Sequence, residues 1–194
     1  VEAARAERVD NATFVVGDAA THPFKPAGYD LVFSRFGVMF FAEPDMAFRN
    51  FQRALKPGGR LVFVCWRTPQ ENPWGMVPVR AAAAHLPPMP RPGPEDPGQF
   101  AFGDRARVER ILAAAGFGTP SFEPLDQPIW MGGSVAEVLD NAGRFGPLAR
   151  AFADATPAQI EKAKEAIAEA LKPHESADGV VLPGACWLVR AAAR

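Results

Sequence analysis

The chain has 194 residues, a formal net charge of −1, and apolar and charged fractions of 48% and 22%. This length and composition fit one globular domain with an ordinary hydrophobic core. No Lys/Arg cluster interleaves with aromatic residues, which argues against a nucleic-acid binder, and no apolar run is long enough to predict a membrane span. Cys65 and Cys186 lie in apolar, strand-like runs, so we expect reduced core thiols in a cytoplasmic protein.

The first third of the chain alternates strand-like and helix-like segments. Residues 13–17 and 29–34 are short, β-branched apolar runs that predict buried strands. A helix is predicted from Pro44, with apolar residues at helical spacing, and Pro57-Gly58-Gly59 ends it before a third strand at Arg60–Trp66. This alternation favours a parallel sheet with helices on its faces.

The composition changes between Thr68 and Gly103. A short helix is predicted at Trp74–His85, and the proline-rich run at 87–94 predicts either a lid over a site or a loose surface loop. Asp104 is placed to cap the next helix, which we expect to end at Gly116.

The last third predicts one edge strand, two helices and a closing strand. Residues 119–126 favour a strand that Pro120 and Pro124 keep near a sheet edge. Capping-box patterns begin helices after Ser134 and Thr156, and Ala185–Val189 predicts the last strand.

Three motifs in this order and spacing carry a family resemblance. They are Val16-Gly-Asp-Ala19 with Pro23-Phe24, then Tyr29-Asp-Leu-Val32, then Leu55-Lys-Pro-Gly-Gly-Arg-Leu61. Together they resemble the class I S-adenosylmethionine-dependent methyltransferases, in particular the group related to ubiquinone/menaquinone biosynthesis. The resemblance covers residues 10–125 best.

The resemblance implies an α/β, Rossmann-like methyltransferase sheet that is parallel with an antiparallel last strand. The family's strand order is 3-2-1-4-5-7-6, and 13–17 and 29–34 correspond to strands 3 and 4. The glycine-rich motif and the acidic residue that holds the ribose would precede Val1, so the first strands are expected to be missing and the 29–34 strand to have a bare edge. We expect residues 1–194 to form a single, partial methyltransferase domain with five parts. These are core strands and a helix at 10–66, a lid or loop at 68–103, a helix and strand at 104–126, a helical insertion at 127–183 and a closing strand at 184–194.

The same resemblance implies a cofactor site for S-adenosyl-L-methionine. Asp18 and Ala19 match the positions that meet the adenine amino group and ring; the alternative for Asp18 is a plain loop cap. Ser34, Arg35 and Phe36 stand at the elbow after the second strand, where the family meets the methionine end of the cofactor and the substrate. For Arg35, pairing with a carboxylate and a surface ion pair stay open.

The substrate side is expected to be apolar. Phe40, Phe41 and Trp74 are candidate substrate-binding residues, with Phe36 and Phe102 as further lining residues, although ordinary core packing is an equal alternative for the phenylalanines. No catalytic residue is assigned, because a sulfonium donor is already activated and needs alignment more than acid–base help. His22 is read as a structural loop residue, and no metal site is predicted.

The predicted function is S-adenosylmethionine-dependent methyl transfer to a small-molecule acceptor, by a fragment of a longer enzyme. The alternative is a non-catalytic methyltransferase-like module that acts by self-association or partner binding, including a homodimer through the bare sheet edge. A nicotinamide-dependent oxidoreductase is disfavoured, because it leaves the motifs at Asp18–Ala19 and Leu55–Gly59 unexplained.

Overall fold

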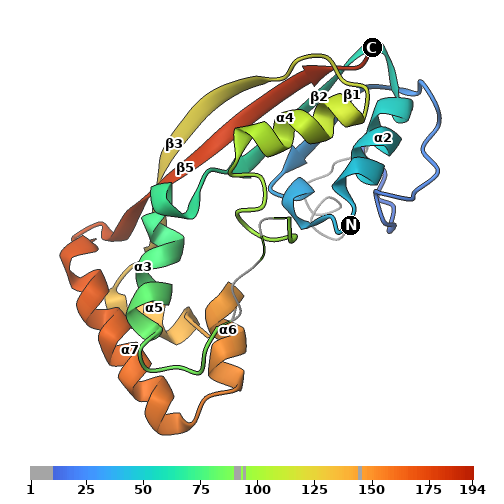
Figure 1. Ribbon diagram of the computed structural model, residues 1–194. Coiled ribbons are helices and arrows are strands. Elements are labelled where there is room, and N and C mark those ends of the chain that lie inside the picture. Colours follow the sequence, from blue (N-terminus) through green and yellow to red (C-terminus); the bar gives the residue numbers. More distant parts are fainter. Residues whose placement is uncertain (1–10, 90–92, 94, 144–145) are drawn as a thin grey trace.

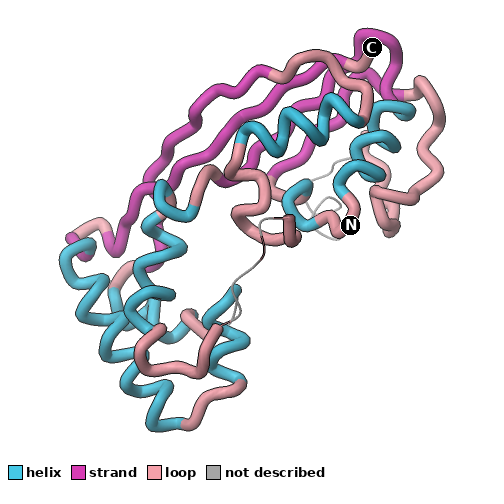
Figure 2. The backbone as a smooth tube through the Cα atoms, viewed as in Figure 1, coloured by secondary structure: helices cyan, strands magenta, loops and turns pink. Residues whose placement is uncertain are grey.

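The computed structural model describes residues 11–89, 93, 95–143 and 146–194. Figure 1 shows a twisted sheet at one end of the molecule and a group of helices at the other, joined by two long strands. Figure 2 shows the same division by secondary structure, with the strands gathered along one side. The predicted cofactor-binding residues belong to the part of the molecule that contains the sheet. The arrangement of its strands therefore determines where these residues lie.

The described strands form a mixed sheet in the order β1-β2-β5-β3. β1 (Tyr29–Arg35) pairs in parallel with β2 (Leu55–Trp66). β5 (Gly179–Ala192) runs antiparallel to both β2 and β3 (Ser121–Gly132), and the short β4 (Glu175–Ser176) also pairs with β5. This is the 4-5-7-6 half of the expected sheet, with its antiparallel closing strand confirmed.

Two helices cover one face of the sheet. α2 (Pro44–Ala54) and α4 (Arg105–Ala114) lie on the same side of the strands. Pro44 occupies the first turn of α2, and the Asp104 carboxylate accepts a hydrogen bond from the Ala106 amide (2.9 Å) at the start of α4, both as predicted. The core between helices and sheet is built from fully or nearly fully buried side chains: Phe48, Phe51, Leu61, Phe63, Cys65, Phe102, Val108, Leu112 and Val189.

The predicted strand at 13–17 is wrong, because these residues pair with no strand that the structure describes. Phe14 and Val15 are 55% and 67% exposed. A β-branched run becomes a strand when a neighbour satisfies its backbone groups, and in the family order two strands separate this run from β1. The described part of the chain supplies neither of them.

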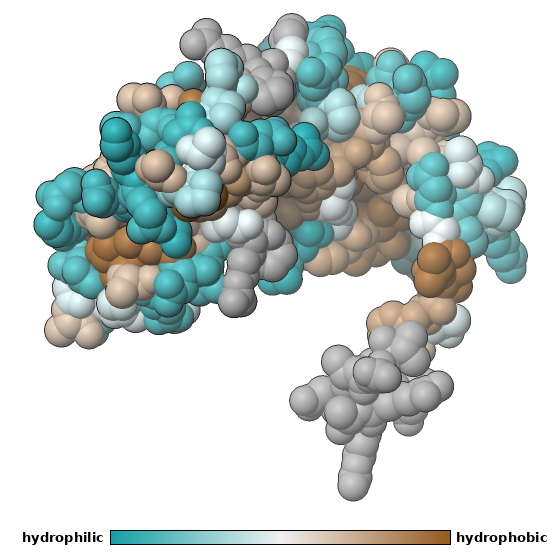
Figure 3. Space-filling view, turned by 90° about the horizontal axis from the view of Figure 1, so that it is seen from below, coloured by the Kyte–Doolittle hydropathy of each residue, from teal (hydrophilic) through white to brown (hydrophobic). Residues whose placement is uncertain are grey.

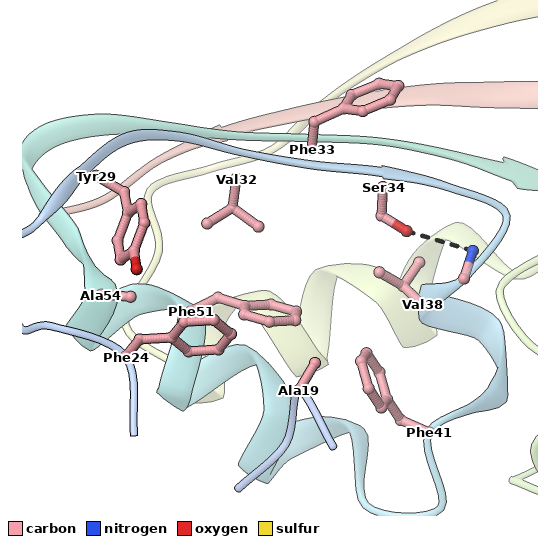
Figure 4. A pocket seen from close by; sticks show the side chains of 11 residues that line it. Ala19, Phe24, Tyr29, Val32, Phe33, Ser34, Val38, Phe41, Phe51 and Ala54 are labelled. Atoms are coloured by element: carbon pink, nitrogen blue, oxygen red, sulfur yellow. Dashed lines mark hydrogen bonds between the residues drawn. The ribbon is translucent and has the colours of Figure 1, made fainter. Parts of the chain in front are cut away.

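β1 consequently lies at an edge of the described sheet. Leu31 and Phe33 are 44% and 60% exposed on the face opposite α2 and α4. Figure 4 shows Phe33 pointing away from Val32 and Ser34, as alternation along a strand requires. The expectation of a bare apolar edge is therefore confirmed for the described residues.

The second group of elements forms a helical lobe with its own core. α3 (Pro73–Ala82), α5 (Val135–Asn141), α6 (Gly146–Ala153) and α7 (Pro157–Leu171) pack around buried side chains that include Ile167, Leu171 and Leu182. The described residues also contain three short 3-10 turns: η1 (Val38–Phe40), η2 (Pro69–Glu71) and η3 (Lys172–His174). The capping box at Thr156 and Gln159 is present.

The boundaries of the helical insertion differ from the predicted 127–183. The β3–β5 ladder continues from Ser121 opposite Arg190 to Gly132 opposite Val180, so the insertion lies between these two strands. Pro124 and Pro128 did not end β3, since an edge strand tolerates a missing N–H on its open side. Within the proline-rich run, residues 90–92 and 94 lie outside the described residues, so the lid prediction is not tested there.

Candidate cofactor site

The chain turns sharply at the carboxyl end of β1. Phe36 has a φ of +60°, a left-handed conformation that is strained for a bulky residue. Two hydrogen bonds hold this elbow: the Phe36 amide donates to the Val64 carbonyl (3.0 Å), and the Gly37 amide donates to Ser34 Oγ (3.3 Å). Strained elbows outside the carboxyl ends of strands are typical of ligand sites in open α/β sheets.

The loop that contains Asp18 and Ala19 forms a compact turn. The Asp18 carbonyl accepts from the His22 amide (2.7 Å), and one Asp18 carboxylate oxygen accepts from the Ala20 amide (2.9 Å). Asp18 therefore does cap its loop. A carboxylate has about four acceptor positions, and Asp18 is exposed, so acceptor capacity is left for an external donor.

A hollow of about 360 Å³ brings the two predicted cofactor segments together. Ala19 from the loop and Ser34 and Gly37 from the elbow line the same space, and Figure 4 shows Ala19 and Ser34 on opposite sides of it. The side chains that complete the lining are almost entirely apolar and include Phe24, Tyr29, Val32, Val38, Phe41, Phe51 and Ala54. Seen from below in Figure 3, hydrophobic side chains gather in a hollowed part of this side of the molecule.

The candidate substrate residues do not share one environment. Phe41 lines the hollow and packs against Phe51, with ring centroids 5.9 Å apart. Phe40 is 60% exposed on η1. Trp74 belongs to a different cluster, where its ring lies 4.7 Å from that of Trp66.

The other aromatic candidates divide between that cluster and the core. Phe36 stacks on Trp66 with ring centroids 4.5 Å apart, and the Trp74 ring packs at a tilt against Trp66, so the three rings form an aromatic cluster at the carboxyl ends of β1 and β2. Phe102 is buried between Phe48 and Phe63 and is a core residue.

Charged and nucleophilic groups add little chemistry to the site. Among the described residues Arg35 is exposed and forms no ion pair, and no cluster of potential metal ligands is present. Burial raises the pKa of the Cys65 thiol to about 12, which makes it inert as a nucleophile. Cys65 stands opposite Trp187 and Cys186 opposite Trp66, so the two free thiols point to opposite faces of the sheet.

Sequence reasoning missed the residue that attaches the Asp18 loop to the sheet domain. Asn50 on α2 donates from its amide nitrogen to the Ala19 carbonyl (3.0 Å) and the His22 carbonyl (2.9 Å). It also missed Tyr29 and Phe24 as lining residues. The helical spacing of Ala47, Phe48 and Phe51 was the available signal that Asn50 lies on the buried side of α2.

Comparisons with known proteins agree with this architecture. Residues 1–63 match the family model described as a methyltransferase domain. The chain is 34% identical over 64 residues to a ubiquinone/menaquinone biosynthesis C-methyltransferase from Shewanella frigidimarina, a match that covers 33% of this chain and 26% of the relative. It is 28% identical over 143 residues to a demethylmenaquinone methyltransferase from Renibacterium salmoninarum, covering 70% of this chain and 57% of the relative.

Solved structures show the same fold at low identity. The YcgJ protein from Bacillus subtilis aligns with a TM-score of 0.58 at 17% identity, covering all of this chain (100%) and 76% of its own. A methyltransferase-like protein from Bacillus halodurans aligns with a TM-score of 0.52 at 16% identity, with 92% and 76% covered. At these identities the likeness shows the fold.

The chain has a Rossmann-like methyltransferase fold, and its first third matches the methyltransferase-domain family model. Its sequence is similar to those of ubiquinone/menaquinone-type methyltransferases. The matches to the two curated relatives span 26% and 57% of their lengths, so much of each relative has no matched counterpart in this chain.

The described residues fit part of an S-adenosylmethionine molecule. An apolar hollow beside an exposed carboxylate suits an adenine ring with its exocyclic amino group. The hollow's lining contains no acidic side chain for the ribose hydroxyls. The described residues therefore suit the adenine end of the cofactor and the part that would lie at the Ser34–Gly37 elbow, but not the ribose.

Proposed function

We propose that this chain takes part in methyl transfer from S-adenosylmethionine to a small-molecule acceptor. The observation that carries the proposal is the shared hollow, which places Ala19 of the Asp18 loop and Ser34 and Gly37 of the elbow around one space. Those are the segments that the family resemblance assigned to the cofactor independently of any structure. The family match and the methyltransferase relatives support the same reaction class.

Each segment has a distinct part in the proposed site. Asp18 would accept a hydrogen bond from the adenine amino group, while Ala19 leaves room for the ring against an apolar wall. Ser34, Arg35 and Phe36 would face the methionine end, where Arg35, free of ion pairs with described residues, is available to a carboxylate. Phe40, Phe41 and Trp74 are proposed as apolar contacts for the acceptor.

The chemistry asked of this chain is alignment and exclusion of water. S-adenosylmethionine, when bound, supplies a methyl group that its sulfonium already activates. The protein's contribution is then to hold the acceptor in line and keep the site dry, which suits the apolar hollow and the rigid, strained elbow at Phe36. No general base is assigned.

We further propose that the complete site includes chain beyond these 194 residues. Among the described strands, β1 pairs only with β2, and its exposed Leu31 and Phe33 suit an additional parallel strand and a covering layer. The partial coverage of the curated relatives supports this arrangement. A cytoplasmic location is proposed with it, since two buried free thiols suit a reducing compartment.

The test is calorimetric titration with S-adenosylhomocysteine, the product form of the cofactor. We expect micromolar binding, equivalent to about −8 kcal/mol. Ala19→Phe should abolish binding by filling the hollow, whereas Ala20→Phe, the matched control one residue away and outside the lining, should not. A folded chain that binds no S-adenosylhomocysteine contradicts the proposal for the isolated chain. Loss of binding in both variants contradicts the assigned position.

The second candidate function is a non-catalytic module that acts through association, including a homodimer. The observation in its favour is the same free edge of β1, with Leu31 and Phe33 exposed. Sedimentation velocity over a range of concentrations separates the two. Stable association without S-adenosylhomocysteine binding favours the module.

A further inference from the structure

A buried amide on α2 makes three hydrogen bonds toward the Asp18 loop and its own helix. Asn50 is only 8% exposed. Its Nδ2 donates to the carbonyls of Ala19 (3.0 Å) and His22 (2.9 Å), while its Oδ1 accepts from the guanidinium of Arg53 (2.8 Å). Both N–H donors of this side chain are therefore used on one short loop.

Apart from Asn50, the loop is held mainly by apolar contacts, because Ala19 and Phe24 pack against the core and the Phe24 ring lies 6.2 Å from that of Phe51. The residues before it, 13–17, pair with no described strand, and Phe14 and Val15 are exposed. After it, the Ala27 amide donates to the Arg53 carbonyl (3.0 Å) and the Gly28 amide to the Ala54 carbonyl (2.9 Å). The described hydrogen bonds from this segment to the rest of the domain thus run to α2 and its end.

The hydrogen bond from Asn50 to the Ala19 carbonyl is coupled to the Asp18 carboxylate through a single peptide group. The Ala19 carbonyl and the Ala20 amide belong to the same planar peptide group. Asn50 holds the carbonyl end of that plane, and its amide end donates to Asp18 Oδ1 (2.9 Å). Fixing the plane therefore fixes the direction of the carboxylate.

We infer that Asn50 is a positioning residue for the adenine end of the cofactor site, acting on Asp18 through the Ala19–Ala20 peptide. This inference rests on the proposed function, because it takes Asp18 as the group that meets the adenine amino group. It adds a residue on a different element, 31 positions from Ala19, on which the orientation of Asp18 depends.

The first experiment compares binding of S-adenosylhomocysteine and S-inosylhomocysteine, in which a carbonyl oxygen replaces the amino group. The variant Asn50→Asp keeps size and the acceptor for Arg53 but removes both donors. We expect the unmodified protein to prefer the adenosine ligand, and Asn50→Asp to lose about tenfold of that preference, the effect of one hydrogen bond to a charged group. Asn72→Asp, the same change at another buried asparagine, should leave the preference unchanged.

The possible results distinguish a failure of the positioning role of Asn50 from a failure of the proposed function. If the unmodified protein binds neither ligand, the proposed cofactor site of the isolated chain fails. If it prefers the adenosine ligand and Asn50→Asp keeps the same preference, the inference alone is overturned. Equal weakening of both ligands also overturns it, because a merely structural role would act on both.

Hydrogen exchange gives a readout that needs no ligand. We expect the amides of Ala20, Thr21 and His22 to exchange faster in Asn50→Asp, while those of β2 and β5 stay protected. Asn50→Ser, which is too short to reach the loop carbonyls, replaces Asn50→Asp if that variant fails to fold. Unchanged loop exchange in a folded variant overturns the inference.

Discussion

The side chain of Asn72 pairs with the backbone of Ala185 as a neighbouring strand would. Asn72 Nδ2 donates to the Ala185 carbonyl (3.1 Å), and the Ala185 amide donates to Asn72 Oδ1 (2.9 Å), across 113 positions of sequence. The same side chain also donates to the Thr68 carbonyl (3.0 Å) and accepts from Trp74 Nε1 (3.1 Å). Asn72 is completely buried, and its hydrogen bonds connect the start of α3 and the Trp74 indole to the middle of β5.

Replacing Asn72 with Leu should destabilise the protein strongly. The apolar side chain leaves the Ala185 amide and the Trp74 indole N–H without their partner inside the structure, each at a cost of about 1–3 kcal/mol. We expect a loss of about 3 kcal/mol in the free energy of unfolding, measured by urea denaturation. Asn141→Leu is the matched control on the surface of α5, and a similar loss there contradicts the explanation.

Arg107 should hold residues 95–101, which follow the proline-rich run, against α4. Its guanidinium donates to the carbonyls of Ala101 (2.8 Å) and Glu95 (2.8 Å) and forms an ion pair with the Glu95 carboxylate (3.1 Å), although Arg107 itself is buried. Arg107→Met should lower the free energy of unfolding by about 2 kcal/mol and speed chymotrypsin cleavage at Phe100.

Arg110→Met is the control for that experiment. Arg110 contacts the same Glu95 side chain (3.2 Å) but is exposed, so its ion pair contributes little. Equal cleavage rates in the two variants would show that the buried carbonyl contacts of Arg107 do not hold the segment.

Much of the sheet was predictable because its determinants are local. The apolar runs of β1 and β2, Pro44 at the start of α2 and Asp104 at the start of α4 each carry their signal within a few residues. The antiparallel direction of β5 came from the family resemblance. Residues 13–17 show the limit: their composition is that of a strand, but a strand needs a neighbour that the described chain does not provide.

The candidate site was predictable to a smaller extent. The motifs named Ala19 and Ser34, and the structure brings these two residues to one hollow. Asp18 is not among the residues that line it, and the cofactor roles of all three stay predictions. Asn50 and Asn72 were not predicted, because the groups they bind lie 28–31 and 113 positions away in sequence. A buried asparagine carries no sequence signal that names such partners.

Stability should depend on pH through Glu71. A hydrogen bond from Arg67, helped by Thr68, lowers the pKa of this carboxyl group below its ordinary value of 4.5. Because the pKa is lower in the folded protein, the contribution is fully present above pH 4.5 and is lost as the pH falls through the folded value. Urea midpoints measured between pH 7 and pH 3 should fall less steeply for Glu71→Gln than for the unmodified protein.

Glu123→Gln is the control for the pH series. Glu123 pairs with Arg190, but both side chains are about half exposed. Removing that charge should therefore leave the fall of the urea midpoint between pH 7 and pH 3 nearly unchanged. A Glu71→Gln variant that loses stability in acid as steeply as the unmodified protein would assign the acid sensitivity to other carboxylates.

The free edge of β1 should make the isolated chain associate. Leu31 is 44% exposed on a strand whose second side has no described partner, and such an edge pairs readily with another chain. We expect concentration-dependent association in sedimentation velocity, and Leu31→Lys should suppress it by placing a charge on the edge while leaving the urea midpoint unchanged. Leu125→Lys, at an exposed position on the opposite edge strand β3, should not suppress it. Equal suppression by both substitutions would locate the association elsewhere than β1, and a monomer at every concentration would show that the exposed edge is protected in solution.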